Sequence, residues 1–329
     1  MDYAHEQTDE MLARIERRIS REYRKAEKET AQKLNDYLDS FRAKDKIWEQ
    51  WVKDGKKTQE EWNNWRTGQM AMGQRWEDMR QSLAEDMHHT NEIAGNIVNG
   101  HVPDVYALNH NYGTYEIESG LGIDTSYTLY DRQTVERLMR DDPQMLPPPG
   151  KRVSERIRDG LDVRWNNQQI QSAMMQSILQ GESIGQIATR LATTVGEKNR
   201  AAALRNARTM TTGAQNAGRV DSYKRAQDMG IKMRQQWVAT LDGRTRHEHR
   251  MLDGETAEVG EPFKVEDEEI RFPGDPAAPG YLVYNCRCTL IAALEGFEND
   301  LSDTSIRYAD KLNGMTYEEW REAKSKKGR

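Results

Sequence analysis

Residues 8–46 are the stretch that most constrains how this chain can fold. Arg, Lys, Glu and Asp dominate it, and its few apolar side chains recur at steps of three and four residues, the spacing of one helix face. The pattern predicts one long helix with a narrow apolar stripe, held in a helical hairpin or in a coiled-coil contact with a partner. The apolar positions are Leu12, Ile15, Ile19, Tyr23, Ala26, Leu34, Tyr37, Leu38 and Phe41.

The composition agrees with a helical fold that lacks one large core. The chain has 329 residues, of which 36% are hydrophobic and 31% are charged, and its mean hydropathy is -0.96. This is too polar for a single well-filled core, but it suits long solvated helices or a subunit that completes its burial in an assembly. The length favours two domains. The net charge of -6 argues against a protein that binds nucleic acid through its overall charge.

No feature of the sequence predicts export or a membrane anchor. No apolar run approaches the roughly 18 to 20 residues that span a bilayer, and the N-terminus has no apolar signal-peptide region. Only one residue separates Cys286 from Cys288, so a disulfide between them would be strained. Reduced thiols or metal ligands in a reducing cytosol are the better interpretation, which predicts synthesis in a cytoplasm.

A tryptophan-rich stretch follows the long helix. Thr58 and Glu61 have the spacing of a capping box, so a helix is expected to begin there. Tryptophans paired three residues apart are typical of a helical core, but tryptophan is also enriched at the centres of protein interfaces. The candidate interface residues are Trp48, Trp51, Trp62 and Trp65.

The middle of the chain is predicted to alternate helices with loops. Helices are expected at about 76–99 and 134–140, with a loop between them that holds one short strand at 126–130. The proline run at 147–150 is the best candidate for a hinge or subdomain boundary.

Two further helices are expected over residues 165–195. Gly181 and Glu182 form the turn between them, and Ser183 with Gln186 has the spacing of a capping box that starts the second helix. The outline is that of a helix-turn-helix, but helix hairpins are common in all-α regions. The first residues of the second helix include few side chains that can contact base edges, so we interpret the hairpin as structural.

A helix predicted from about Glu197 to Met229 carries an ordered polar stripe. Its alanines allow close packing, and a polar stripe on such a helix usually hydrogen-bonds to a fixed partner. The residues of the stripe are Arg208, Thr212, Gln215, Asn216 and Arg219.

The segment from Gln236 to Leu290 concentrates the polar chemistry of the chain. Its strand-like pieces predict a small antiparallel sheet packed against the helix of 197–229. The expected strands lie at 235–241, near 259–263, at 282–284 and at 288–293, with one or two helical turns at 244–252. The predicted fold class is α+β and predominantly α: long N-terminal helices and helix hairpins, then a small antiparallel-sheet module on a long helix.

The order and spacing of motifs in this region resemble the phage Mu F-like minor head proteins, the phage head morphogenesis family. The resemblance is specific over about residues 200–292, looser over 95–195, and does not cover the first 90 residues. It rests on Arg208-Thr209, Asn216-Ala217-Gly218-Arg219, Trp237, Asp242, Arg244-Thr245, His249, Leu252-Asp253-Gly254, Pro273-Gly274-Asp275-Pro276 and Asn285-Cys286-Arg287-Cys288.

This resemblance implies a minor capsid protein of a tailed bacteriophage, made in the bacterial host cytoplasm and packaged in the virion head at the portal vertex. The implied partners are the portal protein and other capsid or scaffolding proteins, and ejection with the DNA is implied as well. The expected domains are a helical N-terminal region with the Trp-rich segment (1–150), a head morphogenesis module (151–295) and a tail with a short helix (296–329). The alternative is a DNA-binding accessory protein of DNA packaging or ejection.

His249, Cys286 and Cys288 offer nitrogen and sulfur donors of the kind that zinc prefers. Many members of the resembled family carry Cys-x-x-Cys at 246–249 and a His-Pro pair before the Asn-Cys-Arg-Cys motif, and this chain has neither. A structural zinc site has four protein ligands, and only Asp242 or His247 remains as a fourth. The alternative is a metal-free knot without a cofactor, in which carboxylates pair with arginines. Its candidates are Arg208, Asn216, Arg219, Asp242, Arg244, His249, Asp253 and Arg287.

The sequence does not predict an enzyme. A histidine beside a cysteine can form a nucleophile–base pair, but no phosphate-binding loop or metalloprotease motif accompanies it. The C-terminal tail starts a short helix at the Thr316–Glu319 capping box and ends in the basic residues 324–329. We interpret this end as solvated, with a basic arm that touches packaged DNA as the alternative.

Overall fold

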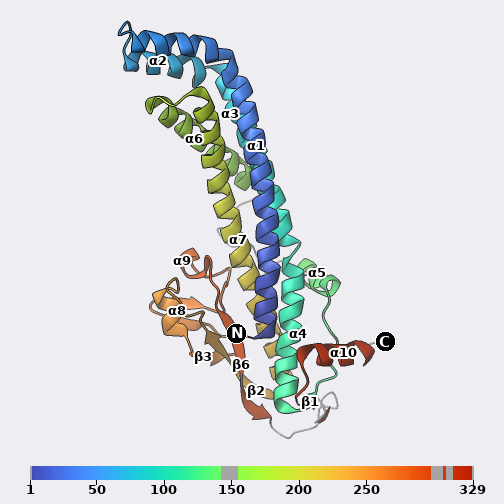
Figure 1. The fold of residues 1–329 in the computed structure, drawn as a ribbon. Helices are drawn as coiled ribbons and strands as arrows, with labels where there is room; N and C mark the ends of the chain where they lie inside the picture. Colours follow the sequence, from blue (N-terminus) through green and yellow to red (C-terminus); the bar gives the residue numbers. More distant parts are fainter. Residues whose placement is uncertain (1, 142–154, 298–306, 309–313, 328–329) are drawn as a thin grey trace. The chain divides into compact units, whose positions relative to one another are not determined.

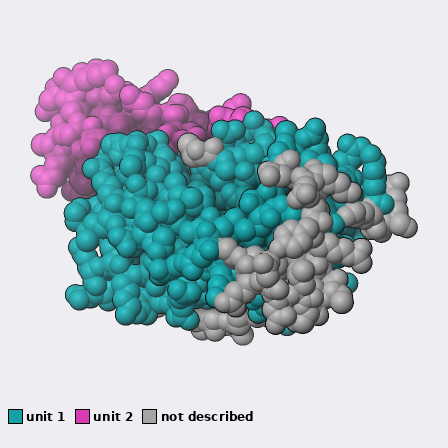
Figure 2. Space-filling view, turned by 90° about the horizontal axis from the view of Figure 1, so that it is seen from below, with its two compact units in different colours: residues 1–16, 98–150, 205–329 teal, residues 17–97, 151–204 magenta. Residues whose placement is uncertain are grey.

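The computed structural model describes residues 2–141, 155–297, 307–308 and 314–327. By their packing, they form two compact units, coloured separately in Figure 2. Unit 1 comprises residues 1–16, 98–150 and 205–329, and unit 2 comprises residues 17–97 and 151–204. Each unit therefore combines segments that lie far apart in the sequence. The three consecutive domains expected above stay a prediction, and the proline run at 147–150 lies outside the described residues.

The described part of unit 2 consists of helices and their turns (Figure 1). They are α1 Tyr3–Lys53, α2 Gln59–Met70, α3 Gln74–Asn99, α6 Glu155–Leu179 and α7 Ile184–Asp228, of which α1, α3 and α7 continue into unit 1. The long helix predicted from residues 8–46 is confirmed as α1, and its stripe residues Ile19 and Leu34 are fully buried. The helix predicted at 76–99 is confirmed as α3.

The start of α2 follows the expected capping box. The side chain of Thr58 accepts a hydrogen bond from the backbone N–H of Glu61, and the carboxylate of Glu61 accepts one from the backbone N–H of Thr58. Two orphan donors at the helix start are thereby satisfied.

Helix α7 is one continuous helix of 45 residues. The prediction of separate helices that end at 195 and begin at 197 was wrong. Glycine inside a helix costs only about 1 kcal/mol relative to alanine, and the residues on both sides of Gly196 are held by burial. Val195 is 2% exposed and Asn199 is 4% exposed, so tertiary packing keeps the helix continuous at Gly196.

Unit 1 includes parts of α1 and α7. Among its described residues, it also contains three helices of more than two turns: α4 Val102–Leu121, α5 Arg132–Asp141 and α10 Tyr317–Lys327. The helix predicted at 134–140 is confirmed as α5. The loop predicted over 100–130 was wrong, because α4 occupies most of it. Pro103 lies in the first turn, where its missing N–H costs nothing, and Gly122 ends the helix at φ 63°. Dense tertiary burial of α4 overrides its weak helix propensity.

The predicted small antiparallel sheet is confirmed. Strand β2 Ile231–Val238 pairs with β3 Thr256–Glu258 on one side and with β6 Thr289–Phe297 on the other. Strands β4 Phe263–Val265 and β5 Glu268–Ile270 form a hairpin, and β1 Ile123–Asp124 pairs with β7 Arg307–Tyr308. Short helices α8 His247–Leu252 and α9 Gly280–Val283 precede β3 and β6.

Two expected strands are absent from the described residues. The strand predicted at 282–284 lies mostly within α9, because a short apolar run does not distinguish a strand from a helical turn. The residues 126–130 have no regular secondary structure, and the nearby strand β1 is shorter and lies before them.

The core of unit 1 lies between the sheet and α7. Trp237 of β2 is fully buried in it, together with Tyr223 and Ala226 of α7. The fold is therefore α+β and predominantly α, with a small sheet on a long helix. None of the helices in the described part of the chain is long and apolar enough to cross a membrane.

Candidate functional site

The polar stripe of α7 hydrogen-bonds to the backbone that leads into β6. Near the start of this segment, the hydroxyl of Thr209 accepts from the backbone N–H of Asn285 at 3.3 Å. The hydroxyl of Thr212 donates to the carbonyl oxygen of Cys286 at 2.7 Å. Asn285 itself has φ 56°, a left-handed conformation that asparagine tolerates better than most residues.

Farther along α7, Asn216 and Arg219 continue the same contact. Asn216 is fully buried, donates from Nδ2 to the carbonyl of Cys288 at 3.3 Å and accepts at Oδ1 from the N–H of Leu290 at 2.9 Å. Arg219 donates from Nη1 to the carbonyl of Leu290 at 2.7 Å. For Thr212, Asn216 and Arg219, the fixed partner expected for the stripe is thus the backbone of residues 286–290, and the helix sets the register of that segment.

The loop at Pro273–Asp275 packs on the same part of α7. Asn216 donates to the carbonyl of Pro273 at 3.1 Å. A Cβ built on Gly213 would lie 2.7 Å from the carbonyl oxygen of Gly274, so both residues must lack a side chain. Gly274 also has φ 80°, which favours glycine.

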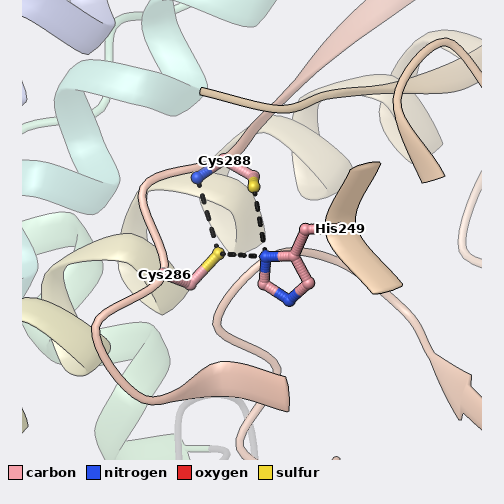
Figure 3. A group of neighbouring side chains, drawn as sticks. All are labelled: His249, Cys286 and Cys288. Atoms are coloured by element: carbon pink, nitrogen blue, oxygen red, sulfur yellow. Dashed lines mark hydrogen bonds between the residues drawn. The ribbon is translucent and has the colours of Figure 1, made fainter. Parts of the chain in front are cut away.

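Cys286, Cys288 and His249 form a buried group (Figure 3). The Nδ1 atom of His249 lies 3.6 Å from Sγ of Cys286 and 3.4 Å from Sγ of Cys288. The Nε2 atom of His249 is 2.7 Å from the carbonyl oxygen of Leu282, to which it donates. Because Nε2 carries the proton in this arrangement, the Nδ1 lone pair faces both sulfur atoms.

The two thiols have opposite pKa shifts. The hydrogen bond with Cys286, followed by the interaction with His249, outweighs burial and lowers the pKa of Cys288 to about 5. Burial, followed by the effect of Cys288, raises the pKa of Cys286 well above its usual range.

Asp242 and Arg287 form a bidentate ion pair beside this group. The two guanidinium nitrogens of Arg287 donate to the two carboxylate oxygens of Asp242 at 2.7 and 2.8 Å. This hydrogen bonding lowers the pKa of Asp242 well below its usual range. The side chain of Arg244 is 82% exposed and lies 3.8 Å from Asp242, so it contributes little.

The other candidate residues do not join the pair. Asp253 accepts from the backbone N–H of Ala239 at 2.8 Å. Arg208 donates to Glu16 at the N-terminal end of the chain. The eight residues expected in one hydrogen-bonded knot thus fall into separate local groups, because most of them satisfy backbone atoms or partners outside the set.

Arg219 lies at the centre of a buried charge network that the sequence did not indicate. Its Nη2 donates to Asp2 at 2.6 Å and its Nε to Asn109 at 3.2 Å. Desolvation opposes the charge of Arg219, but the attraction of Glu116 and Asp2 outweighs it and raises the pKa of the guanidinium. Burial raises the pKa of Glu116 to about 7 against the opposing effect of Arg219. No local sequence pattern connects these residues.

The C-terminal helix is less solvated than expected. Lys324 is 5% exposed, and its ammonium group donates to Glu118 at 2.8 Å and to Asp124 at 2.7 Å. Trp320 also donates to Glu118, at 2.7 Å. The interpretation of Lys324 as part of a solvated basic end was therefore wrong. Residues 328 and 329 lie outside the described residues.

The four candidate interface tryptophans, all in unit 2, separate into two environments. Trp62 is 7% exposed, and its indole N–H donates to Asp45 at 2.9 Å. Trp48, by contrast, stacks on Trp65 with ring centroids 5.8 Å apart and meets Trp51 edge-on at 5.3 Å. Trp51 is 37% exposed. We therefore distinguish the core residue Trp62 from an outer tryptophan cluster, defined as Trp48, Trp51 and Trp65.

Comparison with known proteins connects this geometry to a family. Residues 168–291 match the model of a family described as Phage Mu protein F like protein. The matched range contains both the polar stripe of α7 and the backbone segment 285–290 that it holds. The two halves of this contact therefore belong to one shared module.

Three individual relatives differ in what they are described as. The chain is 31% identical over 231 residues to the minor head protein GP7 of Bacillus phage SPP1, a match that covers 67% of this chain and 69% of that protein. It is 29% identical over 207 residues to an NAD(+)–arginine ADP-ribosyltransferase, EFV, of Enterococcus faecalis, covering 63% of this chain and 40% of that protein. It is 27% identical over 217 residues to an uncharacterized protein of Haemophilus influenzae, covering 65% of this chain and 42% of that protein. No solved structure matches the chain.

Proposed function

Because the chain belongs to the phage Mu protein F like family of phage head morphogenesis proteins, we propose that it is a minor capsid protein bound at the portal vertex. The relative GP7 is described as a minor head protein, which supports a place in the virion. The portal protein is the proposed direct partner, and other capsid or scaffolding proteins are proposed to contact the remaining surface.

The outer tryptophan cluster is the observation that supports a protein contact most directly. Trp51 is 37% exposed and its neighbour Ile47 is 49% exposed, although both are large and apolar. Tryptophan is enriched among the residues that dominate interface energies. Charged pairs surround the cluster, such as Lys53 with Glu49 at 2.6 Å. An apolar centre with a charged rim is the usual composition of a protein interface.

The proposed role is structural and not enzymatic. The Cys–His group, the candidate for nucleophilic chemistry, is buried, with His249 2% exposed and both cysteines 3% exposed. A substrate therefore has no direct access to it in this conformation. The name of the enterococcal relative describes an enzyme of which the match covers only 40%. Incubation with labelled NAD+ and arginine tests the proposal, which predicts no transfer above that of heat-denatured protein.

Co-expression with the portal protein of the same phage tests the proposed partner. We expect comigration with portal rings in size exclusion, with native mass spectrometry giving the number of copies. Trp51→Ala should weaken the complex by at least about fivefold, because interface tryptophans often contribute more than about 1 kcal/mol. Trp165→Ala is the matched control, since Trp165 is 38% exposed on α6.

The outcomes separate the parts of the proposal. Equal comigration of wild type and both variants would refute the tryptophan contact and keep the portal assignment. No comigration of the wild type would refute the portal assignment. A free wild-type chain that binds DNA at low salt and loses it steeply as salt rises would favour the DNA-binding alternative instead.

Departure from the head during infection is the last part of the proposal. Mass spectrometry of intact virions and of emptied heads compares the copies before and after DNA release. Fewer copies in emptied heads would support ejection with the DNA, and equal copies would contradict it.

A further inference from the structure

We infer that His249, Cys286 and Cys288 bind one zinc ion, which ties α8 to the segment that leads into β6. Their donor atoms all lie within 4.8 Å of one another, and all three residues are buried. This site is independent of the portal contact, since it lies within the core of unit 1.

The spacing of the donor atoms matches tetrahedral zinc. Zinc bonds of about 2.3 Å to sulfur and about 2.0–2.1 Å to nitrogen, at the tetrahedral angle, place S and N roughly 3.6 Å apart. The two observed distances from Nδ1 of His249 are 3.6 Å to Cys286 and 3.4 Å to Cys288. The two N–S distances therefore fit a single zinc ion, and the two sulfur atoms lie within 4.8 Å of each other. A thiol–imidazole hydrogen bond has the same span, so the experiment must distinguish the two.

The orientation of the imidazole is already that of a metal ligand. Histidine ligands almost always donate their second ring N–H to a carboxylate, a carbonyl or water, which fixes the ring and its tautomer. Here Nε2 of His249 donates to the carbonyl of Leu282 at 2.7 Å. The unprotonated Nδ1 is left to face the sulfur atoms, as Figure 3 shows.

The backbone that presents the two sulfur atoms is held independently of any ion. Thr212 binds the carbonyl of Cys286, and Asn216 binds the carbonyl of Cys288. The N–H of Cys288 donates to Sγ of Cys286 at 3.4 Å, which orients the side chain of Cys286. Little conformational entropy is then lost when the ion binds, which favours high affinity.

The charges of the site also suit a divalent ion. Two thiolates neutralise Zn2+, so the occupied site carries no net charge in the buried core. Arg246 lies nearby and opposes a cation, but its guanidinium is engaged by the carbonyl of Tyr284. Arg287 is engaged by Asp242.

The donor set leaves one position of the ion open. Within the described part of the chain, no further histidine, cysteine or carboxylate joins the group. Of the two fourth ligands considered from the sequence, Asp242 is paired with Arg287 and His247 is exposed. Most structural zinc sites have four protein ligands, but two cysteines and one histidine completed by a water molecule hold zinc in some catalytic sites, so we assign the fourth position to water.

Metal titration of the full chain tests the site. The purified protein is stripped with a chelator under reducing conditions and titrated with Co2+, whose thiolate complexes absorb in the near ultraviolet, and then with Zn2+. We expect one ion per chain, displacement of Co2+ by Zn2+, and protection of both thiols from alkylation until chelator is added. Native mass spectrometry gives the stoichiometry.

Two variants locate the ligands. His249→Gln and Cys288→Ser should each weaken binding by on the order of 100-fold or more, since loss of even a second-shell partner costs 10–100-fold. His247→Gln is the matched control, because His247 is exposed on the same helix, and it should bind like wild type. Circular dichroism of each variant checks folding.

The wild-type protein alone decides the question if the variants fail to fold. Absence of a thiolate–cobalt band and of bound zinc in the folded wild type would overturn the inference. Equal binding by wild type and folded His249→Gln would also overturn it. Zinc that raises the melting temperature of wild type but not of folded Cys288→Ser would support it.

Discussion

The side-chain amide of Asn216 on α7 hydrogen-bonds to the backbone on both sides of Thr289. Its Oδ1 accepts from the N–H of Leu290 at 2.9 Å, and its Nδ2 donates to the carbonyl of Cys288 at 3.3 Å. One fully buried amide thus fixes the register of the segment that carries both cysteines. The same amide holds the loop at Pro273 through a 3.1 Å hydrogen bond. Asn216 is therefore the residue on which three separate parts of unit 1 converge.

Replacement of Asn216 should destabilise unit 1 strongly. Asn216→Ala leaves the buried N–H of Leu290 without its partner, and each such loss costs about 1–3 kcal/mol. We expect a loss of roughly 2–4 kcal/mol in the free energy of unfolding, measured with urea and circular dichroism. Asn206→Ala, at an exposed position of the same helix, is the control and should change stability by less than about 0.5 kcal/mol. Equal effects of the two changes would contradict the proposed role.

A methyl group at Gly213 should push the Pro273–Asp275 loop away from α7. The added Cβ would lie 2.7 Å from the carbonyl oxygen of Gly274, a backbone atom that cannot rotate aside. Gly213→Ala is expected to cost about 1–3 kcal/mol by overpacking. Gly185→Ala on the same helix meets nothing within 4 Å, so it should be neutral or stabilise by up to about 1 kcal/mol. Thermal melts of both variants measure the difference, and melting of Gly213→Ala at or above wild type would refute the close approach.

Removal of Asp45 should leave a buried charge in unit 2. Its carboxylate accepts from Nε and Nη2 of Arg66 at 2.7 and 2.8 Å, and Arg66 is 1% exposed. Asp45→Ala is therefore expected to cost about 3–5 kcal/mol. Glu49→Ala removes an exposed pair with Lys53 one turn away and should cost less than about 0.5 kcal/mol. Urea unfolding compares the two variants. Similar unfolding midpoints would show that the buried Asp45–Arg66 pair contributes no more to stability than the exposed pair.

The stability of unit 1 should depend on pH through Glu116. Burial raises its pKa from 4.5 to about 7, while Arg219, Asp2 and Tyr223 are the groups that act on it. The folded state binds the proton more tightly than the unfolded chain, so this contribution is fully present below pH 4.5 and is lost as pH rises to about 7.

The matched variant isolates this effect from the other titrating groups. Glu116→Gln should remove the dependence, so its stability relative to wild type should increase between pH 4.5 and 7 by at most roughly 3 kcal/mol. Urea titrations of both proteins at several pH values measure the difference. A constant difference across that range would show that the pKa of Glu116 is not raised.

Local patterns in the sequence determined the long helix α1 and several helix starts. The stripe of residues 8–46 predicts α1, and the capping boxes at Thr58, Ser183 and Thr316 mark real helix starts. Such signals are reliable because the interacting residues lie within one turn of each other. The stripe on α7 was equally visible, since its members recur at helical spacing.

Tertiary structure decided what the local signals could not. It decided that α4 is a helix, that Lys324 is buried against Glu118, and that α7 continues through Gly196. In each case packing against distant segments outweighed a weak local preference.

The candidate site divides in the same way. The sequence by itself determined that His249, Cys286 and Cys288 were the available soft donors and that the α7 stripe needed a fixed partner. Only the tertiary structure decided that this partner is the cysteine-bearing backbone, and that Nδ1 of His249 faces both sulfur atoms. The physical reason is that residues 37 and 39 positions apart meet only when β2, which precedes α8, pairs with β6, which follows the cysteines. No local periodicity records which distant segments will pack together.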